Sequence, residues 1–98
     1  MPAVDEHEID LAAAWRLNPQ VTLRPESFGA LAYHFGTRRL SFLKSRALLA
    51  VVQRLAEYPD ALSACRAAGV GEAELPRYRS ALATLAGSGM IVRQEAPR

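Results

Sequence analysis

The chain has 98 residues, half of them apolar, and a formal net charge of +2. This length is typical of one small domain, and the apolar fraction is too high for a disordered chain. The charges are mixed along the sequence, which argues against the clustered basic surface of a nucleic-acid-binding protein. Cys65 is the single cysteine, so an internal disulfide is excluded and a reducing cytoplasm is expected.

The N-terminal segment is acidic and carries no targeting signal. Asp5, Glu6, Glu8 and Asp10 occur there without a basic residue, so we expect a flexible acidic segment over residues 1–14. No basic residue leads an apolar run as in a secretory signal, and no apolar run approaches the roughly 18 residues that cross a bilayer. We therefore expect a cytoplasmic protein without a membrane partner.

Three apolar runs between Val21 and Leu43 are separated by two turn signals, Pro25–Ser27 and Phe35–Thr37. This pattern predicts a three-stranded antiparallel meander. The expected strands are Val21–Arg24, Phe28–His34 and Arg38–Leu43. Trp15 and Leu17 are the first expected core residues, and they would extend the first strand until Asn18–Pro19 interrupts it.

Alternation along these strands gives each of them one bulky face. The heavy face of the second strand carries Leu31, Tyr33 and Phe35, and the lighter face carries Phe28, Ala30, Ala32 and His34. In the third strand, Leu40 and Phe42 share a face. A small sheet with one bulky face must pack on one side against other elements, so helices are expected to cover it.

The sequence after the meander carries the capping residues and apolar spacing of helices. The first helix begins at the N-cap residue Ser45 and stops before Pro59, and the second runs from about Asp60 to Ala68. The third contains Pro76 in its first turns and is ended by Gly87–Gly89. The expected apolar return and the polar tail are Met90–Val92 and residues 93–98. The predicted fold class is α+β, a three-stranded antiparallel sheet followed by a three-helix bundle, in a domain over residues 15–92.

The residues that catalyse reactions in other proteins do not assemble into a site here. His7 lies in the acidic segment, His34 is expected at a strand end on the surface or across from a neighbouring strand, and Cys65 lies on the apolar stripe of a helix. No zinc-ligand spacing, paired carboxylates or phosphate loop occurs, and Gly87–Gly89 follows a helix as a C-cap does. We expect neither enzymatic activity nor a metal or cofactor.

A winged-helix DNA-binding regulator is the alternative. The second and third helices, joined through Gly69–Gly71, resemble a helix-turn-helix. However, the front of the third helix carries Glu72 and Glu74, with Arg77 and Arg79 as its only positive charges, and the hairpin precedes the helices. No nucleic-acid partner is therefore expected.

A peptide-binding module fits the third strand better. This strand is an edge of the meander, and unpaired edge amides and carbonyls accept a partner strand. Arg38, Arg39 and Lys44 would attract acidic residues of a peptide. Composition alone also allows Arg38 and Arg39 to be charges that simply protect an edge.

A family resemblance favours the peptide-binding interpretation. The runs Arg24–Gly36, Arg39–Lys44 and Ala64–Val70, followed by the helix with Leu75 and Tyr78, resemble the mycofactocin branch of the PqqD-like family of precursor-peptide recognition elements. The resemblance covers Trp15–Val92. It implies a winged-helix-like, PqqD-like fold without catalytic activity.

The resemblance also implies the partners. Such proteins bind the leader of the mycofactocin precursor peptide and present its C-terminal Val-Tyr to a radical S-adenosylmethionine maturase, which oxidatively decarboxylates and crosslinks the tyrosine. The peptide lies as an added strand in the groove between the third strand and the third helix. Carried onto this chain, one groove wall consists of Arg38, Arg39, Leu40, Ser41 and Phe42. The other consists of Leu75, Tyr78, Arg79 and Leu82, although the helical spacing of Tyr78 and Leu82 also fits core positions.

Overall fold

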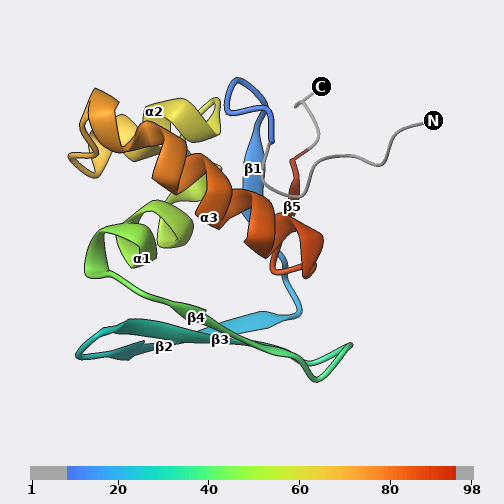
Figure 1. Ribbon diagram of the computed structural model, residues 1–98. Coiled ribbons are helices and arrows are strands. Elements are labelled where there is room, and N and C mark those ends of the chain that lie inside the picture. The colour runs from blue at the N-terminus through green and yellow to red at the C-terminus, as the bar shows by residue number, and fades with distance from the viewer. Residues whose placement is uncertain (1–8, 95–98) are drawn as a thin grey trace.

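A three-stranded antiparallel sheet lies beneath three α-helices in the computed structural model, which describes residues 9–94 (Figure 1). The sheet strands, in spatial order, are β2 (Val21–Glu26), β3 (Gly29–His34) and β4 (Leu40–Leu43). The helices are α1 (Arg46–Gln53), α2 (Ala61–Ala67) and α3 (Leu75–Gly87), with 3-10 turns at Leu55–Glu57 and Glu72–Glu74. The predicted α+β class, with a three-stranded antiparallel sheet and three helices, is confirmed.

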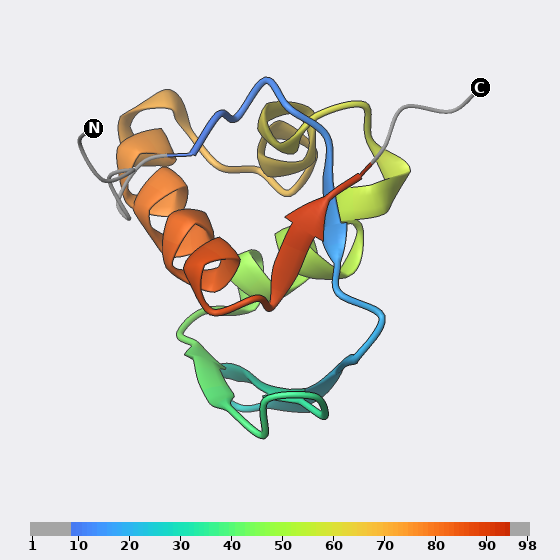
Figure 2. The same ribbon diagram turned by 90° about the vertical axis from the view of Figure 1, so that its right-hand side faces the viewer.

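A second, two-stranded sheet joins the two ends of the described chain. Strand β1 (Trp15–Leu17) pairs antiparallel with β5 (Ile91–Arg93), and Figure 2 shows them side by side. The Arg93 guanidinium lies 5.6 Å from the centre of a Trp15 ring. The prediction that Trp15 and Leu17 extend the first strand was therefore wrong, because a turn in which the Val21 amide donates to the Asn18 carbonyl separates β1 from β2.

The core extends further toward the N-terminus than predicted. Leu11 and Ala13, ahead of the expected boundary at residue 15, are buried, and their carbonyls accept hydrogen bonds from the backbone amides that open α2. Met90 and Ile91 are also buried, so the predicted apolar return onto the core is confirmed. Most of the acidic segment and the last four residues of the tail lie outside the described residues.

The helix boundaries follow their capping residues. The Ser45 hydroxyl accepts a hydrogen bond from the Leu48 amide at 3.0 Å, and the Asp60 carboxylate accepts one from the Ser63 amide at 2.7 Å. The first helix ends at Gln53, short of the predicted position, and the chain continues as a 3-10 turn before Pro59. Gly89 has φ +76, the left-handed conformation that lets the chain leave α3 toward β5.

Strand β3 turns its lighter face toward the helices, which reverses the expected packing. Ala30, Ala32 and His34 are buried, and α1 packs against β3. Helix α1 and the turn after it contribute the large core side chains, namely Leu48, Val51, Val52 and Leu55. These side chains fill the space above the middle of β3, where Ala30 and Ala32 lie, and the heavy face of β3 with Leu31 and Tyr33 turns outward.

Gly29 allows β3 and the end of β4 to approach closely. Its φ is +148, and an added Cβ would collide with the Leu43 carbonyl and lie 2.8 Å from the Ser45 amide nitrogen. Both obstacles are backbone atoms, which cannot swing aside as a side chain can. Any residue other than glycine therefore separates the strands or strains the backbone.

We predict that Gly29→Ala lowers the free energy of unfolding by at least about 2 kcal/mol, measured by urea denaturation. Gly71→Ala is the matched control, because Gly71 has φ −77 and the nearest atom to an added Cβ is 4.0 Å away. Its free energy of unfolding should change by less than about 0.5 kcal/mol. Equal stability of the two variants would contradict the proposed close approach.

Candidate functional site

Strand β4 is one edge of the three-stranded sheet. The pairing register determines, for each of its residues, whether the amide and carbonyl point toward β3 or toward the free edge. In an antiparallel pair, opposite residues that exchange hydrogen bonds alternate with pairs that do not. The His34 amide donates to the Arg39 carbonyl at 2.9 Å, so the next bonded pair along the register is Ala32–Ser41. The amides and carbonyls of Leu40 and Phe42 therefore point away from β3, and no strand within residues 9–94 covers them.

The opposite edge of the sheet, formed by β2, differs in one respect. The Phe35 amide donates to the Gln20 carbonyl at 2.9 Å, which makes Arg24–Leu31 a bonded pair further along the strand. Pro25 therefore occupies an edge-facing position, and proline has no amide hydrogen to offer an incoming strand. The β4 edge contains no proline, so it is the better template for strand addition.

An apolar groove lies between the β4 edge and α3, and residues of both elements and of α1 line it. One cavity of about 390 Å³ is lined by Lys44, Ser45, Leu48, Arg77, Tyr78 and Ala81. A second, of about 330 Å³, is lined by Ser41, Phe42, Lys44, Leu48, Ala81, Thr84 and Leu85. Because the two share Lys44, Leu48 and Ala81, they form one continuous depression, which we call the β4–α3 groove.

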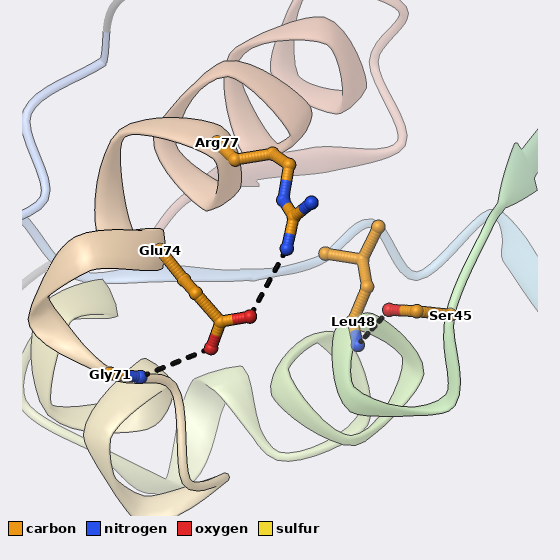
Figure 3. Close-up of polar contacts among 5 residues, drawn as sticks. All are labelled: Ser45, Leu48, Gly71, Glu74 and Arg77. Atoms are coloured by element: carbon orange, nitrogen blue, oxygen red, sulfur yellow. Dashed lines mark hydrogen bonds and ion pairs between the residues drawn. The ribbon is translucent and has the colours of Figure 1, made fainter.

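Polar contacts hold one end of this groove. Glu74 accepts hydrogen bonds from the Arg77 guanidinium at 3.1 Å and from the Gly71 amide at 3.4 Å, and Arg77 lines the same cavity as Ser45 and Leu48 (Figure 3). The charge of Arg77 is thus partly compensated. Lys44, which lines both cavities, forms no ion pair with a described residue.

The residues predicted to bind a peptide occupy different environments. Ser41, Phe42 and Tyr78 line the groove. Leu82 is fully buried in the core and lines neither cavity, so its prediction as a groove residue was wrong. Leu75 packs partly buried against the core, and Arg79 is exposed.

The remaining predicted residues lie at the β3–β4 hairpin and on the outer side of the sheet. Arg38 has φ +63, and Arg38 and Arg39 form the exposed connection before β4, which begins at Leu40 and not at the predicted Arg38. Neither arginine lines the groove or forms an ion pair with a residue in the described range. The Leu40 side chain points to the outer side of the sheet.

Several groove residues were not predicted from the sequence. Ala81 and Leu48 line both cavities, and Thr84 and Leu85 line the second. The spacing Arg77, Ala81, Thr84 places three short or flexible side chains on one face of α3. That spacing was a signal in the sequence, but small residues on a helix face more often indicate close packing than a groove.

The two candidate nucleophilic or basic residues serve the fold. Cys65 is buried in the core as predicted, and burial raises the pKa of its thiol, which disfavours the reactive thiolate. His34 lies at the end of β3 across from Val21, which is one of the two predicted alternatives, and it is buried rather than on the surface. Its Nδ1 accepts the amides of Gly36 and Thr37 at 3.0 and 3.1 Å, so the imidazole braces the hairpin turn.

The described residues give no support to the DNA-binding alternative. Glu72 and Glu74, at the front of α3, are exposed and paired with Arg66 and Arg77 at 3.3 and 3.1 Å. Acidic groups at this position repel phosphates. Within residues 9–94, no group of three or more His, Cys, Asp or Glu side chains is arranged to hold a metal, and no helix has the length and apolarity to cross a membrane.

Comparison with known proteins connects this architecture to one family. The profile of the peptide chaperone MftB family matches residues 14–92. The chain is 59% identical over 91 residues to the peptide chaperone MftB of Mycobacterium tuberculosis, an alignment that covers 93% of this chain and 84% of the relative.

Two further relatives carry the same name. The Mycobacterium ulcerans peptide chaperone MftB is 65% identical over 82 residues, with 84% of this chain and 75% of the relative covered. The Mycolicibacterium smegmatis protein is 54% identical over 83 residues, with 85% and 81% covered. No solved structure matches the chain significantly. The extent of these matches shows that the chain belongs to the peptide chaperone MftB family.

Proposed function

We propose that this protein is a non-catalytic chaperone that binds the leader of the mycofactocin precursor peptide as an additional strand along β4. The observation that carries the proposal is the free β4 edge, where the amides of Leu40 and Phe42 point outward beside the β4–α3 groove. Main-chain hydrogen bonds along an edge supply affinity, and pockets beside the edge supply specificity. The names of the relatives, which describe peptide chaperones, support the same role.

The groove determines which peptides fit. Side chains of an added strand alternate between the two faces of the sheet, so every second one enters the β4–α3 groove. There it meets the apolar surface of Leu48 and Ala81. Lys44 at the groove, with Arg38 and Arg39 at the hairpin, favours a leader that carries acidic residues near its apolar ones.

The second part of the proposed role is presentation to the radical S-adenosylmethionine maturase. A leader held on a chaperone that also contacts the maturase delivers its C-terminus at a high effective concentration. This role requires no catalytic group of the chaperone, in keeping with the buried Cys65 and the structural His34. It requires moderate affinity, because the processed peptide must leave.

We also propose that the fold is a winged-helix-like, PqqD-like recognition domain over residues 15–92, working in the cytoplasm. The order of elements supports this assignment, since a three-stranded meander precedes three helices. The position of α3 beside the last strand of the meander supports it further.

The decisive experiment is an amide-resolved NMR titration with the mycofactocin precursor peptide and, separately, a DNA duplex. Saturable shifts are expected at β4 and along α3 with the peptide, and none with the duplex. Silence with the peptide, or shifts confined to α3 with the duplex, would overturn the proposal.

Replacing the Phe42 backbone amide by an ester, through incorporation of phenyllactic acid, removes one edge-facing donor and retains the ring. We predict a loss of about 1 kcal/mol of peptide-binding free energy, or about fivefold in Kd, measured by calorimetry. The control is the equivalent ester at Ser41, whose amide faces β3 and which should lower folding stability more than the Phe42 ester does. Unchanged peptide affinity of the Phe42 ester would argue against strand addition at β4.

Ala81→Phe tests the groove itself. Ala81 is partly buried and lines both cavities, so a phenyl ring there occupies the space that we assign to peptide side chains. Peptide affinity should fall at least about tenfold, because a good interface residue contributes on the order of 1–2 kcal/mol. Ala67→Phe is the matched control, because Ala67 is exposed on α2 and lines neither cavity of the groove, and equal peptide affinity of the two variants would place the binding site elsewhere.

A further inference from the structure

The outward face of the sheet gathers large apolar side chains, and we call it the outer aromatic face. It consists of Phe28, Leu31, Tyr33, Phe35, Leu40 and Phe42. Four of them, Phe28, Phe35, Leu40 and Phe42, are 45–60% exposed, and they are the large hydrophobic residues that are exposed in the described chain. Single exposed residues of this kind are ordinary, whereas a contiguous group marks an interaction surface.

The members of this face touch one another across the strands. The rings of Phe28 and Phe42 are 6.1 Å apart, and those of Tyr33 and Phe35 are 5.2 Å apart. The register places Leu31 opposite Phe42 and Tyr33 opposite Leu40, which joins the two ring pairs into one patch. The three helices lie on the other side of the sheet and leave this patch uncovered (Figure 1).

The charged residues around the patch are mostly basic. Arg24 lies beside it on β2, where it pairs with Glu26 at 3.1 Å. Arg38, Arg39 and Lys44, at the two ends of β4, are exposed and have no ion-pair partner among residues 9–94. The patch therefore complements an apolar surface bordered by acidic side chains.

We infer that the outer aromatic face is the docking surface for the enzyme that modifies the bound peptide, and that the bound peptide forms part of this surface. The inference rests on the proposed function. Leu40 and Phe42 belong to both sites, because their amides point to the free edge and their side chains lie on the outer face. A peptide strand added at β4 extends the sheet and places its alternate side chains beside Leu40 and Phe42.

Two consequences follow from this shared edge. The enzyme contacts chaperone and peptide together, so the peptide raises the affinity of the chaperone for the enzyme, and by linkage the enzyme raises the affinity for the peptide. A second copy of this chain is a poorer occupant, because a symmetric contact between two such faces brings basic borders together.

The test uses the folded double variant Phe28→Ser/Phe35→Ser, which removes two rings of the outer face that lie outside β4. Binding of the radical S-adenosylmethionine maturase is measured with and without saturating precursor peptide. The wild-type chain should bind the maturase more tightly with peptide. The double variant should lose at least about tenfold in maturase affinity and keep its peptide affinity within about twofold.

The groove variant Ala81→Phe separates this inference from the proposed function. It should lose peptide binding, retain maturase binding in the absence of peptide, and lose the increase that peptide causes. If the wild-type chain fails to bind the peptide, the proposed function is wrong. Even then, a double variant that loses the maturase binding seen without peptide would support the docking surface.

Three results would overturn the inference. The first is an unchanged maturase affinity of the double variant. The second is a dimer of the wild-type chain in analytical ultracentrifugation that is absent from the double variant, while the double variant still binds the maturase. This result would assign the face to a second copy of the chain. The third is binding to phosphatidylglycerol-containing vesicles that the double variant loses, again with maturase binding intact, which would assign it to a lipid surface.

Discussion

The fold depends on the close approach of helix α1 and the end of β4 to the small-residue face of β3. Gly29 leaves room for the Leu43 carbonyl, and Ala30 and Ala32 leave room for the large side chains of α1. Because strand residues alternate between faces, burying these small residues turns Leu31 and Tyr33 outward. The close approach therefore determines the core and, at the same time, the exposed aromatic face.

The pairing register of the two hairpins also determines which backbone amides point to the edges of the sheet. On β4, the residues with outward side chains, Leu40 and Phe42, also have edge-facing amides. On β2 the relation is reversed, and Pro25 occupies an edge-facing position without an amide hydrogen. The sheet thus has one edge suited to accept a strand and one that is partly blocked, although both edges belong to the same meander.

Several polar side chains of the described chain maintain the geometry around β4 and α3. His34 uses Nδ1 to brace the hairpin that leads into β4, and Glu74 joins Arg77 to the turn before α3. Cys65 is buried in the core. Under the proposed function, a rigid edge beside a preformed groove would lower the entropic cost of ordering a flexible peptide.

The sequence by itself determined the meander, the helix cap at Ser45, the core position of Cys65 and the family resemblance, because these follow from local spacing and residue type. Only the tertiary structure decided that β1 pairs with β5, that Ala30 and Ala32 face the helices, and that Ala81 and Leu48 line the groove. Alternation defines two faces of a strand equally well, and the space left by other elements decides which face is buried. The direction of each edge amide likewise depends on the pairing register, which the turn geometry and the packing fix together.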